Sequence, residues 1–433
     1  MTKSKAGIIV LVLLAMAGAA TAQFATWSMS PPKLELTGQG ARALGMGGAF
    51  IGLADDATAI SWNPAGLAQL DRPELSLVGK MEQTRSGFEV KQVDVGGNPL
   101  TLDPDKSQSQ VTANFASLVF PLKLKEKNLA LALAAKQQLD MFRLNEVHEP
   151  GLYDYKEDWS GSVHSFSLGI AYQLSPKVSL GGAASYWTGT PKADVSYYDY
   201  ASGITEAGTI NEPYSGLNFT LGAWGHLKPV KLGAVVHTPL NLKYHDEYSG
   251  DFFASANAPS RVPSSGDWSF KWPFFFGAGI AVEPTKNLTL AADLDLRPFS
   301  SAPIDSNGIK DTTAGYESLT QVRVGAEYLL LLGQWVVPLR AGFRTDPRVY
   351  TGTKITPDTL GTWNFTSDEK QVKGYTATFG SGFVSKRFQL DGALEYGVTK
   401  EPLIWDPSFG KTPSTWNWRE KTIRVLVSGI VRF

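Results

Sequence analysis

The sequence predicts an all-β protein, a fourteen-stranded antiparallel transmembrane β-barrel with an N-terminal hatch, a plug inside the lumen made from its own chain. Three observations lead to this fold class. Many segments alternate apolar and polar residues with the two-residue period of a β-strand. The connections between these segments alternate between short and long. A glycine-rich segment that suits neither a helix nor a strand precedes the first of them.

The first 22 residues have the features of a secretory signal peptide. Two lysines precede an apolar run at 8–15, and small residues end at Ala22. A charged start, a short apolar run and a small-residue cleavage site are typical of such a peptide. We therefore expect a signal peptide at 1–22 and a mature chain that begins at Gln23.

The composition limits the classes of protein that fit. After the expected signal peptide no run of about 18 apolar residues occurs, so the sequence predicts no membrane-spanning helix. The chain has no cysteine, which excludes disulfides and a lipid anchor on a cysteine. A formal net charge of -1 argues against nucleic acid as a partner.

The last strand shows the alternation most clearly. Apolar residues occupy every second position from Ile423 to Phe433, and Arg424 and Arg432 lie among the residues between them. One apolar and one polar face are typical of a barrel strand whose apolar side meets outer-membrane lipid. A terminal phenylalanine on such a strand resembles the C-terminal signal of bacterial outer-membrane proteins. We therefore expect the strand ending in Phe433 to engage the barrel-assembly machinery.

Similar segments recur along the rest of the chain. Their charged faces would not be buried in a soluble sandwich, whereas a water-filled or plugged lumen accepts charges and lipid accepts the apolar faces. The sequence predicts fourteen strands at roughly 74–85, 111–121, 128–139, 163–174, 178–189, 215–227, 231–244, 268–282, 287–297, 318–330, 335–345, 374–386, 387–398 and 420–433.

The connections support a barrel at 73–433. Short turns such as SPK, KPV and EPTK alternate with much longer loops. Short periplasmic turns and long extracellular loops are the pattern of bacterial outer-membrane barrels, so we expect the protein in the outer membrane of a Gram-negative bacterium. A soluble propeller is the alternative all-β fold, but the sequence shows no repeated blade motif.

Several aromatic residues lie near the expected ends of strands. An aromatic ring with a polar edge suits the interface between lipid and water, so we expect most of them to form a girdle. On their strand parity, Trp187 and Trp224 face inward instead. The residues concerned are Trp187, Trp224, Trp268, Trp272, Trp335 and Tyr396.

Residues 23–72 precede the first strand and are expected to form the hatch. The strands of a closed barrel are already paired, and a fourteen-stranded barrel would leak solutes unless it were filled. Glycines between Gly45 and Gly52 permit positive φ and close backbone packing. Asp55 and Asp56 could pair with arginines of the lumen, and Asn63-Pro64 begins a turn.

The segment GARALGMGGAFIGLADDATAISWNPAGLA resembles the N-terminal region of the FadL/TodX family of outer-membrane transporters for hydrophobic compounds. The resemblance rests on Arg42-Ala43, the glycines, Asp55-Asp56-Ala57 and Asn63-Pro64-Ala65, which is followed by Gly66. It implies a fourteen-stranded barrel and a hatch that contains the Asn-Pro-Ala motif. It covers about thirty residues, and the strand count extends it to the whole chain at lower specificity.

The same resemblance implies a function. Members of this family take up long-chain fatty acids or aromatic hydrocarbons passively. The implied steps are capture in an outer groove, transfer to an apolar pocket, and release after the hatch shifts, either sideways through a kinked strand or through the lumen. Phe24 and Trp27 would then contact the ligand.

A second function stays open from the sequence. PorV-like barrels of a protein secretion apparatus are similar to the FadL type and carry nearly the same N-terminal motif. The alternative is therefore a docking or shuttle component of a secretion system. A bound lipid would favour uptake, whereas co-purification with a large secretion complex would favour docking.

Charged residues on the expected inward faces allow two interpretations. Mixed charges on neighbouring strands can neutralise one another and anchor the hatch. Alternatively, Arg340 or Arg344 binds a substrate carboxylate, because a guanidinium group binds a carboxylate through two hydrogen bonds. The residues concerned are Asp293, Asp295, Arg297, Arg323, Glu327, Arg340 and Arg344.

Other inward faces are small or apolar. Those at 130–134, 181–185 and 275–281, the last including Phe275, leave room and apolar surface for a hydrophobic ligand. They equally leave room for the hatch. Both interpretations stay open from the sequence alone.

The sequence shows no enzyme motif and implies no metal or cofactor. Gly45-x-Gly47 lacks the third glycine of a dinucleotide loop, since Phe50 occupies that position. The five histidines show no zinc spacing, and no G-x-S-x-G motif occurs. His164 falls on an outward face near the outer rim, but no nucleophile or orienting partner accompanies it in the sequence.

Overall fold

The computed structural model describes residues 37–433 except 91–105, 150, 152, 202, 254–258, 262–263, 302–303, 307–308, 312–315, 358–362 and 406–413. The expected signal peptide, Phe24 and Trp27 lie outside the described residues. No helix in the described ranges is both long enough and apolar enough to cross a membrane.

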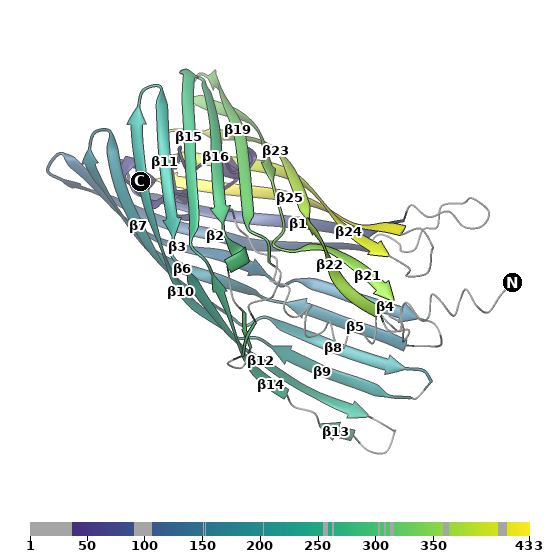
Figure 1. Cartoon of the computed structure of the whole chain (residues 1–433). Coiled ribbons are helices and arrows are strands. Elements are labelled where there is room, and N and C mark those ends of the chain that lie inside the picture. Colours follow the sequence, from purple (N-terminus) through teal and green to yellow (C-terminus); the bar gives the residue numbers. More distant parts are fainter. Residues whose placement is uncertain are drawn as a thin grey trace.

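Fourteen antiparallel strands form a closed barrel, which confirms the predicted fold class (Figure 1). Each strand pairs with the next in the order of the chain, and the last strand pairs with the first. The barrel strands are β1 (Glu74–Val90), β2 (Lys106–Leu124), β3 (Lys127–Asp140), β6 (Ser162–Ser175), β7 (Val178–Gly189), β10 (Tyr214–Leu227), β11 (Val230–His237), β15 (Phe275–Thr285), β16 (Leu288–Arg297), β19 (Leu319–Leu332), β20 (Trp335–Thr345), β23 (Lys373–Val384), β24 (Phe388–Trp405) and β25 (Ser414–Arg432).

The two faces of each strand meet different surroundings. Leu294 and Val324 point outward and are 41% and 44% exposed, whereas Asp293 and Arg323 on the same strands point inward and are 4% and 1% exposed. Exposed leucine, valine and phenylalanine side chains continue around the barrel from strand to strand. Such an apolar surface on a closed barrel is the lipid-facing band of an outer-membrane protein. Phe433 is 68% exposed at the end of this band, and its contact with the assembly machinery stays a prediction.

Two of the expected strands are broken at prolines, which the sequence did not predict. The expected strand at 231–244 is divided into β11 and β12 (Leu240–Phe253), with Thr238-Pro239 between them. The expected strand at 268–282 is divided into β14 (Ser264–Trp272) and β15, with Pro273-Phe274 between them. A proline lacks the N–H group that a central strand would donate, so both breaks interrupt the ladder of the wall.

The two breaks together act as a β-bulge toward β10. Below the break Thr220 lies opposite His237, and above it Ser215 lies opposite Lys243, so the β11–β12 side contains one extra residue. The pairing between the two broken strands keeps its register, since His237 still faces Phe275 and Leu240 still faces Trp272. An extra residue exchanges the faces of every residue beyond it.

The change of phase overturns two predicted positions. Trp268 and Trp272 were expected in the aromatic girdle, but the shift turns both to the inner face, where Trp272 is 6% exposed and Trp268 stacks on Tyr244. Trp187 and Trp224 also face inward, as their parity predicted. Trp335 and Tyr396 are 43% and 45% exposed on the outer surface, the position that the girdle prediction gave them.

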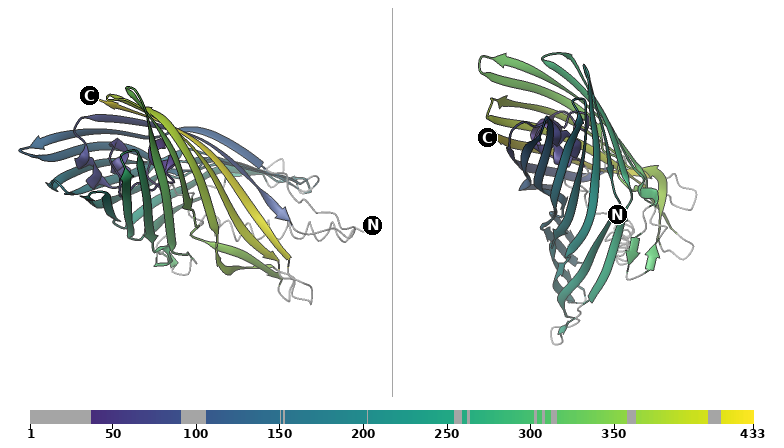
Figure 2. Two further views of the ribbon diagram at one scale, coloured as in Figure 1. Left: turned by 90° about the horizontal axis from the view of Figure 1, so that it is seen from above. Right: turned by 90° about the vertical axis from the view of Figure 1, so that its left-hand side faces the viewer.

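The long connections contribute further strands on the extracellular side. Seven of them form a continuous sheet that extends one side of the barrel wall (Figures 1 and 2). In spatial order these are β4 (Arg143–Glu149), β5 (Tyr153–Ser160), β8 (Lys192–Asp199), β9 (Thr205–Asn211), β12, β14 and β17 (Ile304–Ser306). The remaining elements are β13 (Pro259–Arg261), β18 (Ile309–Asp311), β21 (Thr351–Pro357), β22 (Trp363–Gln371) and the turn η3 (Phe299–Ser301).

Residues 37–72 form the N-terminal segment, which lies among the inward faces of the strands (Figure 2). It contains three short helical turns, α2 (Ala41–Gly45), η1 (Ala57–Ser61) and η2 (Pro64–Gln69). Most of its side chains are fully buried although the helices are too short to bury one another. The barrel wall therefore supplies most of the surface that covers this segment.

Small residues of the wall make this close packing possible. A Cβ atom added at Gly233 would lie 2.0 Å from the Ile51 carbonyl oxygen, and one at Gly342 would lie 2.1 Å from the Gly47 nitrogen. The small inward faces at 130–134, 181–185 and 277–281 pack against the N-terminal segment as well. The sequence left two uses open for these faces, contact with a hydrophobic ligand or room for the hatch. In the structure they give room to the N-terminal segment.

Replacing Gly342 by valine should therefore loosen the N-terminal segment. The added side chain has no space beside Gly47, and overpacking of this kind typically costs about 1–3 kcal/mol. We expect a higher single-channel conductance in planar bilayers if this segment, which packs against the inward faces of the wall, limits the pore. Gly429→Val is the matched control, since no atom lies within 4 Å of a Cβ at Gly429. Equal conductance of both variants and the parent would show that the segment does not limit the pore.

Candidate functional site

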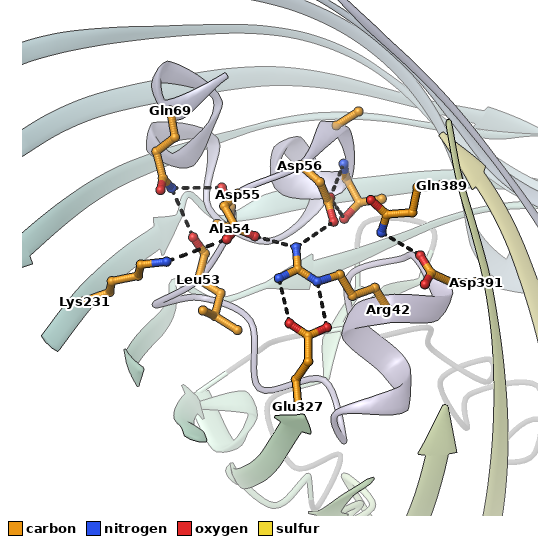
Figure 3. A network of polar contacts seen from close by, with 12 residues as sticks. Arg42, Leu53, Ala54, Asp55, Asp56, Gln69, Lys231, Glu327, Gln389 and Asp391 are labelled. Atoms are coloured by element: carbon orange, nitrogen blue, oxygen red, sulfur yellow. Dashed lines mark hydrogen bonds and ion pairs between the residues drawn. The ribbon is translucent and has the colours of Figure 1, made fainter. Parts of the chain in front are cut away.

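A layer of ion pairs joins the N-terminal segment to the wall (Figure 3). Arg42 donates to both carboxylate oxygens of Glu327, at 3.2 and 3.1 Å, and to Asp55 at 2.6 Å. Asp56 lies 3.5 Å from the same guanidinium group, and Lys231 lies 3.7 Å from Asp55. The prediction that arginines of the wall pair with Asp55 and Asp56 was wrong. Their partner arginine belongs to the segment itself, and the partner from the wall is a lysine.

A second contact of this layer uses backbone groups. Asp293 accepts hydrogen bonds from the backbone nitrogens of Phe50 and Ile51, at 2.7 and 2.9 Å. Arg323 lies 3.6 Å from Asp293 and donates to Asp295 at 2.9 Å. The inward carboxylates of β16 thus bind the N-terminal segment on one side and an arginine of β19 on the other.

Arg340 and Arg344 are held by carboxylates of neighbouring strands. Arg340 donates to Glu327 at 2.6 Å and to Asp391 at 2.7 Å. Arg344 donates to Asp346 and, through two nitrogens, to Glu395. These contacts support the anchoring interpretation of the inward charges, and carboxylate binding by either arginine stays a prediction.

The Asn-Pro-Ala motif supports the backbone of the N-terminal segment. The Asn63 side chain accepts from the Ala65 nitrogen at 3.1 Å, which caps η2, and Pro64 begins that turn. Its amide nitrogen donates to the Ile51 carbonyl at 3.1 Å and to the Ala223 carbonyl on β10 at 3.0 Å. One asparagine thus joins two parts of the segment to the wall, which gives the motif a structural reason.

An apolar cluster fills the lumen toward the outer ends of the strands. We call it the lumen apolar cluster. Its rings meet mostly at steep angles, such as Trp187 and Trp272 with centroids 5.2 Å apart and planes at 82°. Edge-to-face contacts of this kind are favourable for aromatic pairs. Its members are Leu139, Val163, Trp187, Tyr214, Leu240, Leu242, Phe270, Trp272, Phe299, Tyr316, Leu319 and Val349, with Tyr244, Phe275 and Tyr350 packed against them.

The cluster includes Phe275, which the sequence predicted as a ligand contact. Its ring packs against Trp272 and Phe299, and the guanidinium group of Arg297 lies 5.4 Å from its centre. Leu240 and Phe270 were not predicted, because the pattern of each expected strand was continued with a single parity across its proline. Pro239 and Pro273 were the signal that could have revealed the change of phase.

A small polar cavity of about 80 Å³ lies beside the cluster. Leu319 of the cluster lines it, together with Arg297, Arg344 and Arg348. A cavity of this size holds only a few water molecules. Among the described residues, no three histidine, aspartate or glutamate side chains come together in a group that could bind a metal ion.

The two roles predicted for Arg340 and Arg344 can be separated by replacing both with glutamine. Each replacement breaks buried ion pairs, at a cost of up to about 3–5 kcal/mol, although Glu327 keeps Arg42 and Glu395 keeps Arg424 as a partner. If the arginines only anchor the N-terminal segment, conductance rises while the preference between acids and neutral hydrocarbons in an uptake assay is unchanged. Arg72→Gln with Arg387→Gln is the control, since both arginines are exposed. Loss of a preference for acids would instead assign them to the ligand.

No protein-family model and no curated protein sequence matches the chain. Three solved structures match over 92% of this chain and 99% of their own. They are a FadL homologue of Pseudomonas aeruginosa (15% identity, TM-score 0.64), the toluene transporter TodX of P. putida (14%, 0.58) and the toluene transporter TbuX of Ralstonia pickettii (14%, 0.57). The chain thus has the FadL-type barrel fold, as its N-terminal resemblance implied.

Proposed function

We propose that the protein is a passive outer-membrane channel for hydrophobic molecules. The lumen apolar cluster carries this proposal, because it gives an apolar solute a favourable place inside the barrel. Transfer of apolar surface from water into such a site contributes roughly 25 cal/mol per Å². The fold supports the same function, since it is shared with proteins described as toluene transporters.

The site lies between two boundaries. On its outer side the extracellular sheet, β4 to β17, extends the wall and can collect molecules before they reach the barrel. On its inner side the N-terminal segment and its ion pairs close the lumen, so we infer that this segment acts as a hatch. A ligand in the lumen apolar cluster would therefore rest above the hatch.

A seam between β2 and β3 offers a route to the side. The two strands pair only between Phe115 and the short periplasmic turn that joins them, although toward the outer end β2 continues to pair with β1 as far as Lys106. Across the unpaired part, Gln110 donates to Asp140 at 2.6 Å and Thr112 donates to Gln137 at 3.2 Å. Leu139, next to this seam, belongs to the cluster. We infer that release occurs here, through side-chain contacts that break more easily than a strand ladder.

The finer substrate class is a proposal as well. The aromatic rings of the cluster suit aromatic hydrocarbons, and the nearby guanidinium groups of Arg297 and Arg348 suit the carboxylate of a fatty acid. Phe24 and Trp27 remain candidate ligand contacts outside the described residues. The secretion alternative predicts a different behaviour, namely co-purification with a secretion complex and no uptake of small molecules.

Trp272→Ala should reduce the uptake of a labelled monoaromatic hydrocarbon into proteoliposomes. Losing roughly 60 Å² of apolar contact weakens the transient binding of the solute about tenfold. Trp335→Ala is the matched control, because this tryptophan is 43% exposed on the outer surface. Unchanged uptake by Trp272→Ala, or no uptake by the parent protein, would contradict the proposal.

A further inference from the structure

Residues on three adjacent strands form rows across the inner face at the outer end of the lumen. The strands are β10 with the residues just before it, β12 and β14, and their pairing keeps one register over the whole region. Going outward, the rows change from aliphatic and aromatic to purely aromatic and then to acidic. They are Leu240 with Trp272, then Gly216, Leu242 and Phe270, then Tyr214, Tyr244 and Trp268, then Glu212, Asp246 and Gly266.

The acidic row places two carboxylates directly opposite each other. The unbroken register from Asn211–Glu247 to Tyr214–Tyr244 sets Glu212 across from Asp246. Like charges directly opposite on neighbouring strands destabilise a sheet, so the pair conflicts with the fold around it. Such local conflicts are expected at functional positions.

Neither carboxylate is neutralised by a close cation in the described structure. Glu212 is 9% exposed and accepts from the Tyr214 hydroxyl at 2.7 Å. One carboxylate oxygen of Asp246 is buried without any hydrogen-bond partner among the described residues. Gly266, opposite Asp246 on β14, has no side chain to cover it.

The wider surroundings do not balance this charge. The groups that act on Glu212 are Tyr214, Asp246, Arg143 and Glu157. Arg143 is already bound to Glu157 at 3.1 Å and lies over the Trp159 ring. Arg143 thus serves both Glu157 and Glu212, and His245, the group that acts on Asp246, is hydrogen-bonded to Asp267 at 2.8 Å. This arrangement leaves a negative recess at the outer end of the lumen apolar cluster.

The aromatic row below the acids presents flat rings. Tyr214 and Tyr244 are stacked with centroids 4.9 Å apart, and Tyr244 and Trp268 are nearly parallel at 7° and 6.2 Å. The faces of such rings attract organic cations. Tyr214 belongs to the lumen apolar cluster, so the acidic, aromatic and apolar surfaces are continuous.

We propose that this recess binds the cationic head of a hydrophobic amine whose apolar body lies in the lumen apolar cluster. The head would meet Glu212 and Asp246 and the ring faces of the row below. Successive rows lie about 7 Å apart, so an extended amphiphile can contact several of them at once. The inference rests on the proposed function and adds a substrate class to it. An organic acid would meet like charge at the same place.

The test compares three soluble ligands with one skeleton, 4-phenylbutylamine, 4-phenylbutanol and 4-phenylbutyrate. Binding to the purified full-length protein in neutral detergent is measured by titration calorimetry at pH 8. We expect the amine to bind about tenfold more tightly than the alcohol, because its hydrogen bonds to the carboxylates are charge-assisted, and the acid to bind most weakly. Glu212→Gln with Asp246→Asn should lower the amine to the affinity of the alcohol.

The control variant removes two carboxylates from the outer face of the same sheet. Asp194→Asn with Asp267→Asn makes the same change in charge but should keep the order of affinities, since both residues are exposed. Unchanged alcohol binding by the test variant shows that it has folded. Equal affinities, or an amine preference that survives in the test variant, would overturn the inference and leave the proposed function intact. Binding of none of the three would also remove support from the proposed function.

The preference for the amine should also depend on pH. Burial raises the pKa of Glu212 to about 7, and burial raises the pKa of Asp246 as well. The carboxyl of Glu212 is therefore charged at pH 8 and neutral at pH 5, whereas an alkylamine with a pKa near that of lysine, about 10.4, stays protonated. We expect the amine to lose most of its advantage between pH 8 and pH 5. An advantage that is constant over this range would assign it to groups other than Glu212.

Discussion

Every side chain of a barrel strand faces either lipid or lumen, and the two faces alternate along the strand. One extra residue in a strand therefore moves every later side chain to the opposite face. In this protein the phase changes once on each of two neighbouring strands, at Pro239 and Pro273. Because both strands change at the same level, their pairing with each other keeps its register, whereas the pairing with β10 shifts by one residue. Leu240 and Trp272 are buried in the lumen only because of this shift. The lumen apolar cluster thus depends on one extra residue in the wall.

The same constraint divides the lumen into two levels with different chemistry. Below the shift the wall carries glycines, alanines and charges, which suit a backbone docked through hydrogen bonds such as those from Phe50 and Ile51 to Asp293. Above the shift the wall carries large aromatic rings, which leave no room for a docked backbone and pack against one another. A ligand and the N-terminal segment therefore do not compete for one surface.

Much of this fold could be predicted from the sequence, because the alternation of a strand and the length of a loop are local properties. Fourteen strands, the inward charges and the packing of a glycine-rich segment against the wall follow from such patterns. The partners of Asp55 and Asp56 did not, since the fold brings Arg42 back to them from a turn earlier in the chain. Phe299 and Tyr316 come from a long connection without periodicity, so no sequence pattern placed them in the cluster. The proline breaks were visible in the sequence, but their effect on parity appears only when the neighbouring strand is known.

The lumen apolar cluster and the ion-pair layer below it also differ in the free energy that is needed to displace their side chains. Trp272 contacts the rings of Trp187, Phe270 and Phe299, and each such ring pair contributes about 0.5–1.5 kcal/mol beyond its buried area. An apolar ligand replaces these contacts with equivalent ones, so the net cost of entering the cluster is small. Displacing Arg42 from Glu327 and Asp55 breaks ion pairs without forming new ones, at up to about 3–5 kcal/mol, and leaves Glu327 with Arg340 alone. In the proposed channel, a solute moving down its gradient would therefore meet a lower barrier within the cluster than through the N-terminal segment.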